Sequence, residues 1–317
     1  WSSDVCSSDS AKAAKEAETA AKEIATQATA AKVAVNAAKT LANNIFNAAK
    51  TAHDAADTAL NGTTGAKADA ATKKTARNNA LTKATDAKGT VGSAAEVVDK
   101  ATAVKNAAAA NMSVFALANI AEGQANTAAT LLTIAKISVN SVDGLANPTD
   151  ADFISANTAV KDAQTEAGNT VTAADKTVAE AQKGLDAANA LPAADPNKAA
   201  AILAATALKG AADAALQAAK DYKTTADALA KAQPAHLQAQ RALANATQLE
   251  LDTKEKLDDA KDASDAADDA FAKVVIAEQV ALDMSAKATT ARQDADAVLT
   301  NVKAAKTPLE ATVDAVA

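Results

Sequence analysis

The sequence has few of the residues on which metal centres, disulfide frameworks and most active sites depend. Its 317 residues include one cysteine, one tryptophan, one tyrosine and two histidines, and only 2% are aromatic. A disulfide framework needs paired cysteines, and a thiolate zinc site needs several. We therefore predict a protein that is not an enzyme, with no catalytic residue, no cofactor and no bound metal.

Glycine and proline are also scarce, with nine and five residues respectively. Alanine supplies roughly a third of the chain, far above its usual share. Alanine has the highest helix propensity, whereas the β-branched and aromatic residues that strands favour are few. The composition predicts an all-α fold.

The charges are unevenly distributed along the chain. Residues 11–145 carry 15 Lys and Arg against 11 Asp and Glu, whereas residues 146–317 carry 17 against 26. We expect an N-terminal helical segment and a C-terminal acidic helical segment, packed together as one extended unit. No basic stripe with interleaved aromatics is present, so a nucleic-acid partner is not expected. No apolar run reaches the ~18 residues of a membrane-spanning helix.

Residues 1–10 read WSSDVCSSDS and differ from the alanine-rich sequence that follows. They resemble the translated sequencing-adapter string found at the ends of assembled metagenomic genes. We expect an artefact here, which would make the chain a fragment without its true N-terminus. A disordered natural tail is the alternative.

Apolar residues recur in heptads near the N-terminus. One stripe consists of Ala14, Ala21, Ala28, Val35, Ala42, Ala49 and Ala56. A second, offset by three, consists of Ala17, Ile24, Ala31, Ala38, Ile45, Ala52 and Ala59. Together they predict a long amphipathic helix with a coiled-coil seam, ending at Asn61.

The same pattern recurs near the C-terminus. One stripe consists of Ala260, Ala267, Val274, Ala281, Ala288, Ala295 and Val302. The other consists of Ala263, Ala270, Ala277, Met284, Ala291, Val298 and Ala305. Because proline breaks helices, we expect this helix to begin after Pro234 and to end before Pro308.

Shorter helices are predicted between these two. They cover residues 66–88, 93–142 with a break at Gly123, 150–190 behind a Thr149 cap, and 196–233. Short connections make successive helices antiparallel. The architecture predicted is an elongated antiparallel bundle or coiled-coil rod of about six alanine-rich helices. Since a buried alanine contributes only about 0.8 kcal/mol and leaves little hollow space, such a seam argues against a deep ligand pocket.

Three groups of polar residues are candidate sites. His53 lies beside Asp54 and Asp57, and His236 follows Pro234; neither has a set of metal ligands near it in sequence, so both are expected to be solvated. The carboxylates at helical spacing are Asp258, Asp259, Asp262, Asp265, Asp268 and Asp269. They lack the glycine turn of a calcium loop, so a solvated helix face is favoured.

The segment 106–142 is unusually apolar, with Glu122 and Lys136 as its only charges. One interpretation is a membrane-active hairpin divided at Gly123, resembling α-helical pore-forming toxins. The other is the most buried helix pair of the bundle. Asn111, Asn119, Asn126 and Asn140 fit poorly in lipid, which favours the second.

Repeated Ala-Ala-Lys triplets begin at Ala20, Ala30, Ala37 and Ala48. They resemble the eleven-residue motifs of late-embryogenesis-abundant desiccation proteins, but only the last two have that spacing. No family is assigned. We expect a structural or interaction protein, a spacer or stalk of a larger bacterial surface, secreted or phage-tail-type protein, with an exported location favoured over the cytoplasm. Its partner would be another protein or a second copy, through alanine-lined helix faces. A pore-forming toxin and a desiccation-type protein that folds on binding are the alternatives.

Overall fold

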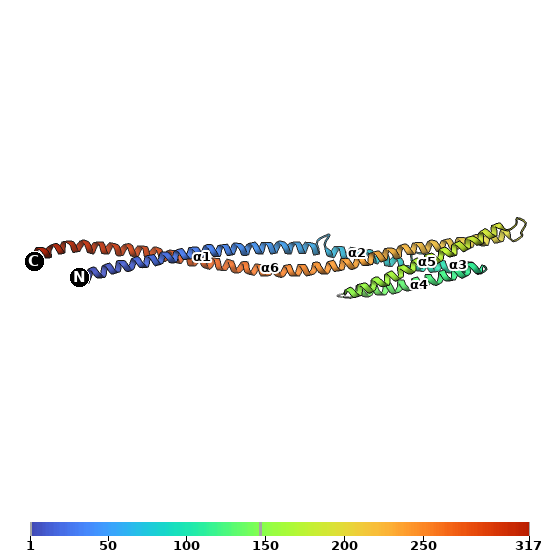
Figure 1. Cartoon of the computed structure of the whole chain (residues 1–317), viewed down its shortest axis with the longest axis horizontal. Coiled ribbons are helices and arrows are strands. Elements are labelled where there is room, and N and C mark those ends of the chain that lie inside the picture. The colour runs from blue at the N-terminus through green and yellow to red at the C-terminus, as the bar shows by residue number, and fades with distance from the viewer. Residues whose placement is uncertain (1, 146–147, 317) are drawn as a thin grey trace. The chain divides into compact units, whose positions relative to one another are not determined.

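The protein is a set of packed α-helices (Figure 1). The computed structural model describes the backbone of residues 2–145 and 148–316 and the side chains of residues 8–145 and 148–307. Within these ranges there is no strand, which confirms the prediction of an all-α helical bundle. The helices are α1 (Ser2–Asn61), α2 (Ala66–Thr85), α3 (Ala94–Ala107), α4 (Met112–Gly144), α5 (Asp150–Ala190) and α6 (Lys198–Val316).

The chain divides into two compact units. Unit 1 combines residues 1–57 with residues 248–317, and unit 2 consists of residues 58–247. Unit 1 therefore joins α1 to the C-terminal part of α6, from opposite ends of the sequence. The expected division at residue 145 followed charge and stays a prediction. The artefact interpretation of residues 1–10 also stays a prediction, and the side chains of residues 1–7 lie outside the described ones.

The two helices of unit 1 are antiparallel (Figure 1). Their polar cross-helix pairs are Glu18–Arg292, Lys32–Glu278, Lys39–Asp268 and Asn43–Ser264. Residue numbers rise on α1 as they fall on α6, and each pair adds up to 307 or 310. The two sums differ by less than one helical turn, so the register does not slip by a heptad between residues 18 and 43.

The seam of unit 1, meaning the residues of each helix that lie against the other, matches one predicted stripe on each helix. On α1 the buried and half-buried residues alternate at spacings of three and four, and they include Ala14, Ala21, Ala28, Val35, Ala42, Ala49 and Ala56 as predicted. On α6 the stripe that begins at Ala260 lies in the seam as predicted.

The second predicted stripe of each helix is wrong by one residue. The residues that begin at Ala17 on α1 and at Ala263 on α6 are all exposed. The following positions lie in the seam instead: Ala11, Glu18, Ala25, Lys32, Lys39, Phe46 and His53 on α1, and Ser264, Phe271, Glu278, Ser285, Arg292 and Leu299 on α6. The apolar pattern misplaced the seam because several of its true members are charged and pair with a charge on the other helix.

Unit 2 has a conventional apolar core. Helix α4 contributes one buried stripe, which is Val114, Ala118, Ala121, Ala125, Ala128, Leu132, Ala135, Val139 and Val142. It packs against α3 and α5, and against Tyr222 and Leu229 of α6. The opposite side of α4 is exposed, for example at Ile120 and Ile137. Most of the 106–142 segment therefore lies in the single helix α4, buried along one face, and is not a helix pair divided at Gly123.

Two helix starts follow local capping rules. Before α5, the Thr149 hydroxyl accepts a hydrogen bond from the Asp152 amide at 3.4 Å, and the Asp152 carboxylate accepts one from the Thr149 amide at 2.8 Å. This reciprocal cap confirms the predicted start. Before α4, the Asn111 side chain accepts a hydrogen bond from the Val114 amide at 3.2 Å.

Three predicted helix breaks are wrong. Helix α4 continues through Gly123, and the chain turns instead between Ala107 and Met112. A hairpin divided at Gly123, as the membrane interpretation requires, is therefore not formed. Helix α6 continues through Pro234 and Pro308. An interior glycine costs a helix only about 1 kcal/mol and an interior proline about 3 kcal/mol, and around Gln233 and Leu237, both buried, packing supports the helix.

Candidate functional site

The exposed stripes of unit 1 form an apolar surface, which we call the outer face. It consists of Ala17, Ile24, Ala31, Ala38, Ile45 and Ala52 on α1, and of Ala263, Ala270, Ala277, Met284, Ala291 and Val298 on α6. Each of these residues directly precedes a seam residue. Two antiparallel helices are exchanged by a two-fold axis perpendicular to the plane that contains them. This rotation maps each face of the pair onto itself, so equivalent heptad positions of the two helices lie on the same face. The stripes of both helices therefore lie on one side of the seam.

A groove confirms that the two stripes share a side. Ile45 and Ala48 of α1 line it together with Ala260 and Ala263 of α6, and its volume is about 540 Å³. Two charged residues of α6, Lys256 and Asp259, also line it. The groove is shallow and open, and most of its lining is apolar. It follows the boundary between the helices and does not enclose a chamber.

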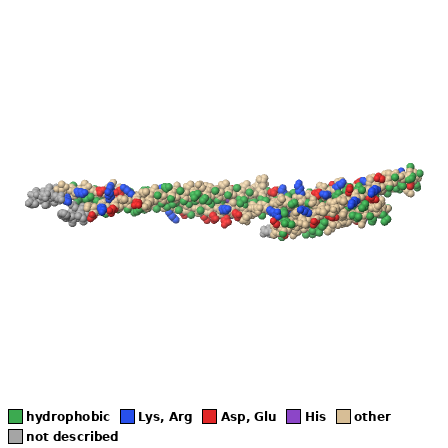
Figure 2. Space-filling view, viewed as in Figure 1, with side chains coloured by type: hydrophobic (Ala, Val, Ile, Leu, Met, Phe, Trp, Pro, Cys, Tyr) green, Lys and Arg blue, Asp and Glu red, His purple; other side chains and the backbone are tan. Residues whose placement is uncertain are grey.

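The larger side chains of the outer face are well exposed. Ile24 is 50% exposed, Ile45 52%, Met284 53% and Val298 56%. Figure 2 shows hydrophobic side chains along the surface of this part of the chain. Large contiguous apolar surfaces of this kind mark interaction sites on proteins. Because no member of the outer face is charged, the apolar pattern of the sequence identified these residues. The pattern wrongly predicted that they lie in the seam between the helices, whereas they are exposed beside it.

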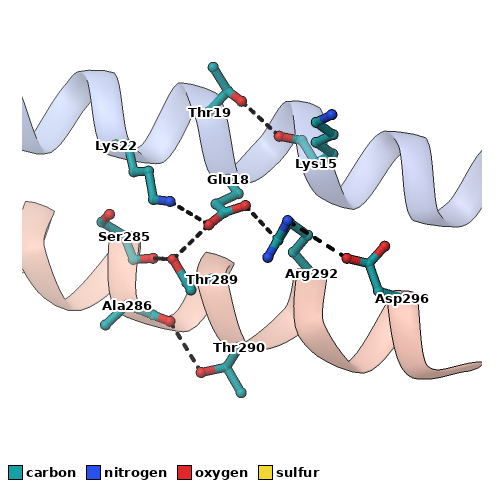
Figure 3. Close-up of polar contacts among 10 residues, drawn as sticks. All are labelled: Lys15, Glu18, Thr19, Lys22, Ser285, Ala286, Thr289, Thr290, Arg292 and Asp296. Atoms are coloured by element: carbon teal, nitrogen blue, oxygen red, sulfur yellow. Dashed lines mark hydrogen bonds and ion pairs between the residues drawn. The ribbon is translucent and has the colours of Figure 1, made fainter.

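Glu18 is the centre of a polar network within the seam (Figure 3). It accepts from Lys22 of its own helix at 2.6 Å and from the Thr289 hydroxyl of α6 at 3.1 Å. Arg292 lies 2.8 Å away, measured from Nε to Oε2. The Nε–H does not point at the carboxylate, so this contact is an ion pair without a hydrogen bond. The Lys22 ammonium, helped by Thr289 and Arg292, lowers the pKa of Glu18.

Two further ion pairs follow along the same seam. Lys32 lies 2.6 Å from Glu278 and lowers the pKa of that carboxyl. Lys39 lies 3.0 Å from Asp268, and its ammonium also stands 5.0 Å from the ring centre of Phe271. Each pair joins a charge on α1 to the opposite charge on α6, so all three favour the observed register over a slipped one.

Unit 2 contains a buried polar cluster that sequence analysis missed. Arg77 of α2 is fully buried, and its Nη2 lies 2.5 Å from Oδ2 of Asp143 at the end of α4. His236 of α6 is 1% exposed, with Nε2 4.0 Å from Asp143 Oδ1. Nη1 of Arg77 and both amide atoms of Gln233 have no hydrogen-bond partner among the described residues. These residues come from three helices distant in sequence, so no local spacing could reveal the cluster.

The environment of His236 differs from the solvated one predicted. Its ring meets the Phe153 ring edge-on, with centroids 6.1 Å apart. Burial, helped by the positive charges of Arg77 and Lys74, lowers the pKa of His236 to about 4, although Asp143 opposes this shift. The imidazole is therefore neutral at physiological pH and acts as a packed core residue.

The other two candidate sites from the sequence, His53 and the aspartates of residues 258–269, do not form a common site. His53 is half-buried in the seam of unit 1, not at its flank. The six aspartates of residues 258–269 are exposed, as predicted. Lys261 pairs with Asp265 at 2.7 Å, and this carboxylate raises the pKa of Lys261. Among the described residues, no three His, Cys, Asp or Glu side chains gather closely enough to hold a metal ion.

Two hollow spaces of unit 2 are small. One cavity, between α3, α4, α5 and α6, is lined mainly by alanines such as Ala101 and Ala118 and has a volume of about 10 Å³, about the space of a single water. A surface depression between Ile120 and Asn169 measures about 150 Å³, with Lys176 as its only ionisable lining residue. Neither space gathers an acid and a base.

One helix, the part of α6 with described side chains (Lys198–Thr307), contains a stretch long and apolar enough to cross a membrane. Of that stretch, 17% is buried. Length and composition alone do not distinguish a spanning helix from a bundle helix. Helix α4, on which the membrane interpretation depended, does not meet the same criterion.

No family model matches the chain, and neither a curated protein nor a solved structure is detectably similar to it. The functional argument therefore depends on the surfaces and contacts described above.

Proposed function

We propose that the chain is a non-enzymatic structural and interaction protein. It would act as a helical spacer or stalk within a larger bacterial surface, secreted or phage-tail-type protein. The observation that carries this proposal is the outer face of unit 1, because a long and mostly apolar surface suits protein contact. The two small spaces of unit 2, neither of which is lined by both an acid and a base, give further support.

A spacer must hold its length, and this can be measured within unit 1. Spin labels at Lys12→Cys and Thr51→Cys, both exposed on α1, would be placed on a Cys6→Ser background. At 1.5 Å per residue, an intact helix separates the two sites by about 58 Å. We expect a narrow distance distribution near this value in pulsed electron spin resonance. A broad distribution at shorter distances would contradict the spacer function.

A desiccation-type protein that folds only with a partner makes a different prediction. Such a chain would show little helix alone in dilute buffer, because too little apolar surface is buried to offset the entropy of ordering. The proposed spacer should instead show high helicity and a cooperative melt by far-ultraviolet circular dichroism. Low helicity that rises only on drying would favour the alternative.

A further inference from the structure

We propose that a second copy of this chain docks on the outer face of unit 1, so that two antiparallel helix pairs form a four-helix bundle. This inference rests on the proposed interaction function and names its partner. The argument starts from the heptad pattern. A two-stranded seam needs two apolar positions per heptad, whereas helices that face the core of a larger bundle have a third.

The third apolar position of each heptad in unit 1 is that of the outer face. It is apolar more consistently than one of the two seam positions. This position is apolar from Ala17 to Ala52 on α1 and from Ala263 to Val298 on α6, whereas one heptad before Ala263 it is the charged Lys256. The seam, by contrast, contains Glu18, Lys32 and Lys39. A helix pair that buries its polar residues and exposes its apolar ones has the pattern expected for half of a bundle.

The outer face is complementary to itself. With the register of the seam, Ile24 stands level with Met284, and Ile45 stands level with Ala263. A two-fold axis parallel to the helices would set each level of one copy against the same level of the second. Ile24 would then meet Met284 of the second copy, and Ile45 would meet the small Ala263. The methyl groups of the intervening alanines would allow close helix approach.

The area of the outer face is sufficient for a stable dimer. From Ala17 to Ala52, α1 is about 50 Å long, and two helices of about 10 Å diameter side by side give about 1,000 Å² per copy. Standard protein interfaces bury about 800 Å² per partner. The face is therefore large enough without help from unit 2.

The charges do not oppose such docking. The positions of α1 next to the outer face carry no charge: Ala13, Ala20, Gln27, Ala34, Leu41, Ala48 and Ala55. On α6 the equivalent positions balance Lys273 and Lys287 against Asp259 and Asp294. Of the acidic cluster, Asp258, Asp262, Asp265 and Asp269 occupy heptad positions away from the outer face. Repulsion between the acidic copies would therefore act mainly on the opposite side.

Sedimentation equilibrium of the whole chain, with a reducing agent to keep Cys6 unpaired, tests the proposal. We expect a mass twice the 31.5 kDa of one chain. Ile24→Glu combined with Ile45→Glu should give the single-chain mass, because each dimer would bury four carboxylates. Thr26→Glu combined with Thr40→Glu is the matched control, since both residues are exposed on another side of α1, and it should remain dimeric.

A milder variant covers the case in which the glutamates disturb folding. Ile24→Ala combined with Ile45→Ala keeps the helix propensity and should raise the dissociation constant at least tenfold, which corresponds to about 1.4 kcal/mol. The proposal is overturned if the unmodified chain is monomeric at about 100 µM, or if the outer-face and control variants behave alike. If the chain is monomeric but the distance distribution between the spin labels on α1 is still narrow, the dimer proposal is wrong and the proposed spacer function stands. Binding of the monomer to lipid vesicles or to an unrelated helix through this face would likewise overturn it.

Discussion

Glu18 of α1 and Arg292 of α6 face each other across the seam of unit 1, with 2.8 Å between Oε2 and Nε. Both residues occupy heptad positions that are usually apolar. Charged residues at such positions cost stability but can fix register. Since Lys32–Glu278 and Lys39–Asp268 follow the same register, we interpret these pairs as the feature that aligns an otherwise uniform alanine seam.

Removing one partner of the Glu18–Arg292 pair should destabilise unit 1. Glu18→Gln removes the counter-charge that Arg292 has on the other helix and leaves only the longer contact with Asp296, at 3.7 Å. The melting temperature should therefore fall by a few degrees, and amide exchange should speed up over residues 11–56. Replacing both residues by leucine should restore stability or increase it, because apolar packing replaces an ion pair. The control is Lys50→Gln, whose exposed pair with Asp54 should contribute almost nothing. Equal effects of Glu18→Gln and Lys50→Gln would refute this role.

The composition was sufficient to predict the fold class but not the rotation of the helices about their axes. Two of the four apolar stripes lie in the seam and two lie on the surface. A stripe of alanine does not show which partner it meets, because a single methyl group stabilises either arrangement by a similar amount. The buried cluster of Arg77, Asp143 and His236 could not be predicted either, since its members are brought together only by packing of α2, α4 and α6.

The buried imidazole of His236 should make unit 2 sensitive to mild acid. Its pKa is about 4 in the folded chain against an ordinary value of 6.5, so between these values the unfolded state binds a proton that the folded state does not. The contribution of His236 should therefore lower stability by about 3 kcal/mol as the pH drops from 6.5 to 4, and level off below. His236→Gln, which cannot titrate, should flatten the slope above pH 4.5 in denaturant unfolding at each pH. Below 4.5 the carboxyls whose pKa values are lowered, such as Glu18 and Glu278, contribute a slope of their own. An unaltered slope in His236→Gln would disprove the assignment.

Two glycines of unit 2 should respond in opposite ways to the same substitution. At Gly123 a methyl group would meet nothing within 4 Å, so Gly123→Ala should stabilise the protein by roughly 0.5–1 kcal/mol through helix propensity. At Gly92, φ is +87°, and a methyl group would lie 2.4 Å from the Thr225 hydroxyl oxygen. Gly92→Ala should therefore destabilise by roughly 1–3 kcal/mol. Chemical denaturation of both variants checks this, and a change of the same sign in the two would contradict it.

Pro234 shows how packing overrides a local helix breaker. It lies inside α6 and has no N–H, so the carbonyl of Ala230 lacks its usual helical donor. The flanking residues Leu229 and His236 are each 1% exposed, which indicates that contacts with the rest of unit 2 keep the helix continuous.

Replacing Pro234 by alanine should therefore stabilise unit 2. The gain from restoring a helical hydrogen bond, about 3 kcal/mol in an exposed helix, is reduced by up to about 1 kcal/mol because alanine leaves the unfolded chain more flexible. We expect a net gain of about 2 kcal/mol in denaturant unfolding and slower amide exchange around residue 234. Pro192→Ala is the matched control, because Pro192 lies in the connection between α5 and α6, where its substitution restores no helical bond. If Pro234→Ala were neutral or destabilising, the proline ring itself would have to contribute packing that offsets the missing hydrogen bond.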